Sequence, residues 1–314
     1  MPFFRALRPL ASLAPLAALA ACAHAAAMPA DEHAGHAMPM PAHAPTAAGA
    51  MHASAQGAAL PAGADEARAR LAASPRHGEW AMVRTGPADS VRAWVVYPER
   101  RDAAPVVLVV HEIFGLSDWI RSVADQLAAE GFIAIAPDLL TMKNVPAGPT
   151  GETDPDSARV AIRTLDPADV HRQLRAVAAY GMGLPAAQKR YGIVGFCWGG
   201  GTSFAHAVRS PELGASVVYY GTSPTTAELA SVRAPVLGLY GENDARVNAT
   251  IAPADSALRA LGKTYERHVF AGAGHGFLRQ QDGQSGANLT ATQQAWPLTV
   301  GWFRRYLEAP GAAR

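Results

Sequence analysis

Short apolar runs alternate with amphipathic segments from residue 76 onwards, and this alternation limits the folds that are open to the chain. The run "PVVLVV" (105–110) has no polar face, as expected for a strand that is buried on both sides. Residues 118–130 have the pattern of an amphipathic helix that Gly131 ends. Strands separated by helices indicate a mostly parallel sheet flanked by helices. We therefore predict one α/β domain over residues 76–314.

Further strands and helices are predicted along this domain. The other expected strands are 91–97, 132–137, 190–195, 215–220, 235–240 and 264–270. The other expected helices are 166–180, one that starts at Trp198, 253–261 and 291–307. Residues 143–155 are rich in Pro, Gly, Thr and Asp, so we predict an irregular loop there, over the active face.

The N-terminal segment has the pattern of an export signal. Arg5 and Arg8 precede an apolar stretch that is rich in small residues. Leu19-Ala20-Ala21-Cys22 resembles the bacterial lipobox, in which the cysteine is lipidated and becomes the mature N-terminus. Ordinary cleavage after residues 23–25 is the alternative. We expect a signal peptide over residues 1–22 and a periplasmic protein that a lipid on Cys22 anchors to the membrane.

Residues 23–75 are predicted to form a disordered tether. Most of this segment is Ala, Pro, Gly, His and Met with almost no aromatic or β-branched residues, so it buries too little apolar surface to fold. Imidazole and thioether groups suit copper, so weak copper capture stays open beside a plain spacer role.

The net charge and the number of cysteines restrict the classes of function that are open to the protein. A net charge of +1 argues against a nucleic-acid partner. The chain has two cysteines, Cys22 and Cys197, so lipidation or removal of Cys22 leaves no intrachain disulfide. An accessible lone thiol in an oxidising compartment is open to oxidation. This favours a function for Cys197.

The stretch "YGIVGFCWGGGTSFA" (191–205) places Cys197 at a glycine-tight turn between a strand and a helix. Gly195-Phe196-Cys197-Trp198-Gly199 has the spacing of a nucleophile elbow, with cysteine in place of serine. Such a turn exposes the nucleophile at the end of its strand. An inert buried cysteine is the alternative.

Four polar residues follow predicted strands and would meet at one edge of the sheet: Glu112, Cys197, Asp244 and His275. The chain order of nucleophile, acid and histidine is that of α/β-hydrolases. A thiol that attacks an acyl carbon needs a base, which we assign to His275, and the base needs an orienting carboxylate. Asp244 is the expected orienting group, and Glu242 is its rival.

Four motifs carry a resemblance to one family. They are "HEIFG" (111–115), "GFCWGG" (195–200), "GENDARV" (241–247) and "GAGHGFLR" (272–279). In this order they resemble dienelactone hydrolase, and the resemblance covers about residues 78–308. It implies the α/β-hydrolase fold and a triad of Cys197, His275 and Asp244. It also implies that Glu112 lies beside the resting thiol and is displaced by substrate.

The rest of the expected site surrounds the triad. The backbone N–H groups of Ile113 and Trp198 are expected to form the oxyanion hole. Arg279 coincides with a family arginine that binds the substrate carboxylate, and a guanidinium suits that group. Arg159 and Arg163 lie where a second such arginine is found, and the sequence does not choose between them.

We therefore predict a hydrolase that cleaves a small ester or lactone through a cysteine acyl-enzyme, without a metal or an organic cofactor. The expected partner is the small-molecule substrate, the expected state is a monomer, and the lipid makes the only membrane contact. The alternative is a lipid-anchored binding protein in which the His/Met tether handles copper and the α/β body has little catalytic activity.

Overall fold

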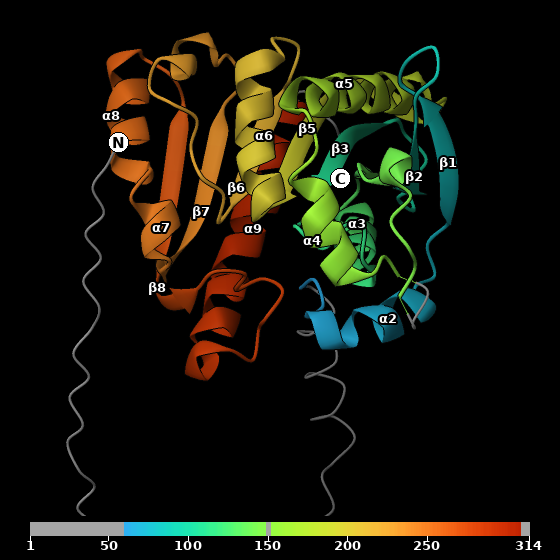
Figure 1. The fold of residues 1–314 in the computed structure, drawn as a ribbon, viewed down its shortest axis with the longest axis horizontal. Helices are drawn as coiled ribbons and strands as arrows, with labels where there is room; N and C mark the ends of the chain where they lie inside the picture. Colours follow the sequence, from blue (N-terminus) through green and yellow to red (C-terminus); the bar gives the residue numbers. More distant parts are fainter. Residues whose placement is uncertain (1–59, 149–151, 309–314) are drawn as a thin grey trace, which may run out of the picture. The chain divides into compact units, whose positions relative to one another are not determined.

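An eight-stranded sheet with helices on both faces forms the body of the protein (Figure 1). A computed structural model describes residues 60–148 and 152–308. The strand order is β1-β2-β4-β3-β5-β6-β7-β8, and β2 pairs antiparallel with both β1 and β4. All other neighbouring strands are parallel. The strands are β1 Gly78–Arg84, β2 Ser90–Val96, β3 Ala104–Val110, β4 Ile133–Asp138, β5 Ala187–Phe196, β6 Ala215–Tyr219, β7 Val236–Asn243 and β8 Tyr265–Gly274.

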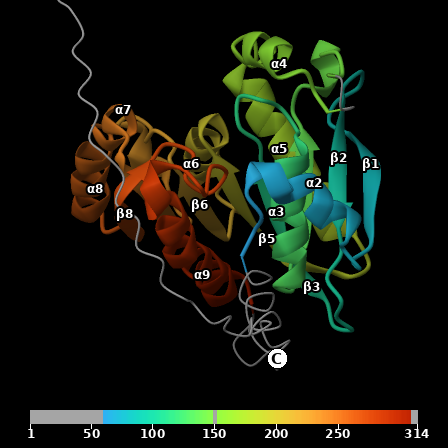
Figure 2. The same cartoon turned by 90° about the horizontal axis from the view of Figure 1, so that it is seen from below.

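Helices cover the sheet in two layers, each with its own apolar core. One core lies between the sheet and α2, α3 and α9 (Figure 2), and the other lies between the sheet and α5, α6 and α8. The helices are α2 Ala64–Ala72, α3 Asp118–Ala129, α4 Pro155–Ile162, α5 Pro167–Gly183, α6 Trp198–Arg209, α7 Ala245–Asn248, α8 Ile251–Ala260 and α9 Ala287–Leu307. Short 3-10 helices span Thr141–Lys143, Glu228–Ser231 and Gln284–Gly286.

The predicted α/β fold with a mostly parallel sheet is confirmed. Every residue of β3 and β4 is buried, which is why these strands are apolar except for Asp138 at the end of β4. Among the strands and α-helices, four were not predicted from the sequence: β1, α4, the short α7 and α2. Strand β1 lies at the edge of the sheet and is partly exposed, so it has no apolar run. Helix α4 directly follows the loop predicted over residues 143–155.

The predicted end of the tether at residue 75 is wrong, because α2 lies inside the segment 23–75. This helix is rich in alanine, the strongest helix former, and has acidic residues in its first turn. Ala67 is fully buried in the core beneath α3. The indole Nε1 of Trp119 donates to Ala62 O at 3.1 Å, which fixes the chain before the helix. The folded part therefore begins earlier than the composition suggests.

The predicted signal peptide, Cys22 and the first part of the tether lie outside the described residues. Within residues 60–148 and 152–308, no helix combines the length and the apolar character needed to cross a membrane.

The turn between β5 and α6 holds Cys197 in a strained backbone conformation, with φ of 56° and ψ of −115°. Its N–H donates to Tyr219 O at 3.1 Å, which ties the turn to the neighbouring strand. The turn is too tight for side chains on its glycines. A Cβ on Gly195 would lie 1.9 Å from Gly199 O, and one on Gly199 would lie 2.4 Å from His111 O. The two glycines are therefore a steric requirement of the elbow.

We expect Gly195→Ala to destabilise the protein by at least about 3 kcal/mol, because backbone atoms that cannot move aside meet the new methyl group. Gly301→Ala is the matched control. Gly301 lies in α9 with nothing within 4 Å of an added Cβ, so helix propensity should raise the stability by roughly 0.5–1 kcal/mol. Urea unfolding of both variants measures the two effects. Equal stability of the wild type and Gly195→Ala would contradict this account of the elbow.

Candidate active site

The parallel strands bring the four predicted polar residues to one edge of the sheet. Glu112 follows β3, Cys197 follows β5, Asp244 follows β7 and His275 follows β8. These strands run in the same direction, so their carboxyl ends meet at that edge. Residues that are up to 163 positions apart in the chain are thereby placed around one site, since 275 − 112 = 163.

His275 is paired with Asp244. Its Nδ1 lies 2.5 Å from Asp244 Oδ2, and the Asp244 side chain is almost fully buried. The same carboxylate accepts a hydrogen bond from Val247 N at 3.4 Å, which holds it at the start of α7. Glu242, the rival orienting group, is exposed and accepts from Gly272 N at 2.8 Å. The pairing leaves Nε2 of His275 as the nitrogen that can exchange a proton.

Glu112 is buried beside Arg279. Nε of Arg279 lies 2.8 Å from Glu112 Oε2, although the N–H is not aligned for a hydrogen bond. Burial raises the pKa of Glu112 to about 7, and the nearby guanidinium opposes this rise. The guanidinium also stacks on the ring of Phe114 at 4.9 Å, and Arg159 stacks on the same ring at 4.9 Å. Arg279 thus faces Glu112.

The thiol of Cys197 is half-buried, and it forms no hydrogen bond with His275 in the described structure. Burial, with a smaller contribution from the Glu112 carboxylate, raises the pKa of Cys197 to about 11. The Trp198 N–H and the Arg246 guanidinium act in the opposite direction. The resting group is therefore a neutral thiol at pH 7. The hydrogen bond between a nucleophile and its base is often long in an enzyme without substrate and shortens when substrate binds.

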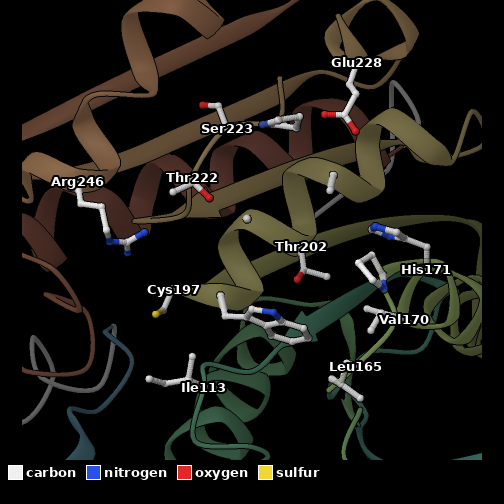
Figure 3. Close-up of a pocket in the computed structure, with 15 residues that line it drawn as sticks. Ile113, Leu165, Val170, His171, Cys197, Thr202, Thr222, Ser223, Glu228 and Arg246 are labelled. Atoms are coloured by element: carbon white, nitrogen blue, oxygen red, sulfur yellow. The ribbon is translucent and has the colours of Figure 1, made fainter. Parts of the chain in front are cut away.

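A cavity of about 480 Å³ opens beside the thiol (Figure 3). Ile113 and Trp198, the expected oxyanion-hole residues, line it together with Cys197. The remaining lining residues are Leu165, Pro167, Val170, His171, Gly201, Thr202, Ala205, Thr222, Ser223, Pro224, Glu228 and Arg246. Arg279, Arg159 and Arg163 do not line it. The structure therefore does not place the expected carboxylate-binding arginines on this wall.

Comparison with known proteins decides the family. A model of the dienelactone hydrolase family matches residues 91–307. The chain belongs to the dienelactone hydrolase family. A Salmonella typhimurium protein named "Putative carboxymethylenebutenolidase" is 32% identical over 231 residues, which cover 69% of this chain and 84% of the relative. A Methylorubrum extorquens protein of the same name is 33% identical over 228 residues, which cover 69% and 77%.

Solved structures agree with this assignment. A crystal structure of a Klebsiella pneumoniae protein named "Putative Dienelactone Hydrolase" superposes with a TM-score of 0.65 at 28% identity, and the match covers 74% of this chain and 99% of the other. The resemblance seen in the four motifs, the α/β-hydrolase fold and the expectation of an ester or lactone hydrolase are confirmed.

Sequence reasoning missed two residues at the site of this dienelactone hydrolase family member. Tyr220 has φ of 39°, its hydroxyl is buried without a hydrogen-bond partner, and its ring centroid lies 5.1 Å from that of His275. Tyr220 carries no signal in the sequence, since it is the last residue of a predicted apolar strand. Arg246 lines the cavity. It lies inside the motif "GENDARV", two positions after Asp244, and the sequence alone does not distinguish it from an exposed surface arginine.

We expect Glu112→Gln to make the thiol of this family member more reactive. The substitution removes a negative charge near Cys197 and leaves the positive charge of Arg279, so it favours the thiolate. Alkylation by iodoacetamide at pH 8.5 should become roughly tenfold faster. Glu242→Gln is the matched control, because its carboxylate is exposed and bonded to Gly272. An alkylation rate in Glu112→Gln at or below that of the wild type would contradict the assigned influence of Glu112.

Proposed function

We propose that the protein hydrolyses a small ester or lactone through a thioester on Cys197. One observation carries this proposal. The elbow presents the thiol to a cavity at the same sheet edge where Asp244 binds His275. A nucleophile, a base and an orienting carboxylate in this order are the parts that acyl transfer requires. The cavity volume of about 480 Å³ suits a small molecule.

The first half of the reaction forms the thioester. Nε2 of His275 takes the thiol proton as Sγ of Cys197 attacks the carbonyl carbon, and the carbonyl oxygen becomes an oxyanion. The backbone N–H groups of Ile113 and Trp198 stabilise this charge, as donors beside a nucleophile elbow do. The C–O bond then breaks, and the leaving alkoxide takes the proton from His275. In a lactone the leaving group stays attached to the acyl chain.

The second half releases the acid. Water attacks the thioester carbon while His275 takes one of its protons, and a second tetrahedral oxyanion forms. The C–S bond breaks, and the proton on His275 returns to the thiolate. Asp244 stabilises the imidazolium in both halves and keeps Nδ1 protonated.

Glu112 and Arg279 act on the resting state in this proposal. The raised pKa of Cys197, to about 11, keeps the thiol neutral until a substrate is in place. Because Arg279 holds the Glu112 carboxylate, a group that draws Arg279 away would change the charge beside the thiol. A neutral resting thiol is also less open to oxidation.

The names of the relatives support an ester or lactone as substrate. Besides the carboxymethylenebutenolidases, a Bradyrhizobium protein named "Probable 2-oxo-3-(5-oxofuran-2-ylidene)propanoate lactonase" is 28% identical over 243 residues, which cover 73% of this chain and 94% of the relative. The copper-handling alternative rests on a His/Met tract that lies before residue 60, outside the described residues. None of the relatives named above supports it, and we do not propose it.

Hydrolysis of p-nitrophenyl acetate and of cis- and trans-dienelactone tests the proposal. We expect Cys197→Ala to lower kcat/KM by a factor of at least about 10³. We expect Asp244→Asn to lower it by a factor of about 10² to 10⁴, because the asparagine stabilises the wrong tautomer of the His275 imidazole. Glu242→Gln is the control for the carboxylate and should stay within about twofold of the wild type. A Cys197→Ala variant that hydrolyses these substrates at the wild-type rate would rule out the thioester route.

We also propose that the enzyme acts in the periplasm, anchored by a lipid on Cys22. The lipobox-like Leu19-Ala20-Ala21-Cys22 after a basic and apolar start supports this. In cells fed a labelled fatty acid, the full chain should take up the label and remain in the membrane fraction. Cys22→Ser should abolish labelling. A labelled Cys22→Ser variant, or an unlabelled wild type, would contradict the anchor.

A further inference from the structure

His111 is a buried histidine that the proposed reaction does not use. It directly follows β3 and precedes Glu112 in the chain. The residue is fully buried, and it does not line the cavity beside Cys197. A buried polar ring needs hydrogen-bond partners inside the protein, because an unpaired polar group away from water is costly. Both ring nitrogens of His111 have such a partner.

The two partners of His111 determine which ring nitrogen carries the proton. Nδ1 lies 2.7 Å from the carbonyl oxygen of Glu112, a group that can only accept. Nε2 lies 3.3 Å from the backbone nitrogen of Leu139, whose N–H can only donate. Nδ1 therefore carries the proton and donates it to Glu112 O, and Nε2 accepts with its lone pair. Burial lowers the pKa of His111, in agreement with a neutral ring at pH 7.

The hydrogen bond from His111 Nδ1 orients one peptide unit. The carbonyl group of Glu112 and the N–H group of Ile113 belong to the same planar trans peptide, so they point in opposite directions. The Glu112 carbonyl oxygen is held by His111 and, at the longer distance of 3.4 Å, by Gly115 N. Ile113, one of the two residues expected to supply an oxyanion donor, lines the cavity (Figure 3). Holding the carbonyl toward His111 therefore directs the Ile113 N–H away from His111.

The ring of His111 also packs against the residue that supplies the second expected donor. The rings of His111 and Trp198 are stacked, with centroids 5.7 Å apart and planes 20° apart. The bond from Leu139 N ties the His111 ring to the end of β4, which pairs with β3 in the sheet. One ring thus supports the peptide unit of Ile113 by a hydrogen bond and the side chain of Trp198 by packing.

We propose that His111 is a positioning residue that directs the N–H of Ile113 at the oxyanion of the acyl-transfer reaction. This rests on the proposed function, because the oxyanion forms only when the Cys197 thiol attacks a carbonyl carbon. A donor stabilises the developing charge best when it is already in place, and a hydrogen bond weakens steeply as its angle becomes poor. His111 acts through the peptide unit and touches no reacting atom.

Two reactions of the same thiol test this inference in the full-length enzyme. Hydrolysis of p-nitrophenyl acetate passes through an oxyanion. Alkylation by iodoacetamide forms an S–C bond, releases iodide and forms no oxyanion. We expect His111→Leu to lower kcat/KM for the ester roughly tenfold, less than the roughly 10²–10³-fold loss when an oxyanion donor is removed. The alkylation rate at pH 8.5 should stay within about twofold of the wild type, because the thiol and its base are unchanged.

Two further variants separate this role from a loss of stability. The side-chain amide of asparagine can take the place of Nδ1 as donor to Glu112 O, but it leaves Leu139 N without an acceptor. His111→Asn should therefore unfold at a lower urea concentration than the wild type and keep at least about half of its ester activity. Should His111→Leu not fold, His111→Ala, which introduces no new atoms, takes its place with the same expectation.

His206→Leu is the matched control. His206 is also fully buried, and its Nε2 lies 3.1 Å from the hydroxyl oxygen of Tyr191. It should change the rates of ester hydrolysis and alkylation by the same factor. Equal ester activity in the wild type and His111→Leu, a parallel loss of both rates in His111→Leu, or an equal loss in His111→Asn would overturn the inference.

Crystal structures of the variants keep this test separate from the proposed function. The plane of the 112–113 peptide should keep its orientation in His111→Asn and turn in His111→Leu. If the wild type does not hydrolyse the ester, or if Cys197→Ala remains active, the proposed function fails, and a turned plane still supports the positioning of the Ile113 N–H by His111. An unchanged plane in His111→Leu would overturn that positioning whatever the activity.

Discussion

The site depends on a backbone constraint at Cys197. A cysteine with φ of 56° is strained, and the surrounding contacts must hold it there. Gly195 and Gly199 allow β5, α6 and the chain after β3 to approach each other at distances that any side chain would prevent. The hydrogen bond from Cys197 N to Tyr219 O fixes the turn on the sheet. The thiol therefore stands beyond the carboxyl end of the sheet with its position set by the backbone.

A balance of buried charges acts on that thiol. Burial disfavours the charged forms of the Cys197 thiol and the Glu112 carboxyl group. It raises the pKa of Cys197 to about 11 and that of Glu112 to about 7. Arg279 lies against Glu112, and Asp244 lies against His275, so each buried carboxylate has a cationic or proton-donating neighbour. An uncompensated carboxylate at either place would be costly. Burial, with a smaller contribution from the Glu112 carboxylate, keeps the nucleophile protonated at rest.

Much of the fold could be predicted because its signals are local. The apolar runs of β3 and β4 follow from burial on both faces, and the motif around Cys197 follows from the steric needs of one turn. The contacts between distant residues could not be predicted. Nothing in the sequence shows that Arg279 faces Glu112, or that Arg246 lines the cavity. These placements depend on loop paths and side-chain rotamers that only the packed structure fixes.

The most direct test of the central claim is to trap the acyl-enzyme. The enzyme would be mixed with p-nitrophenyl acetate, quenched in acid during turnover, digested and examined by mass spectrometry. The account predicts one acetyl group on the peptide that contains Cys197, absent before mixing and lost after the substrate is consumed. An acetyl group on another residue, or full turnover after complete alkylation of Cys197, would contradict it.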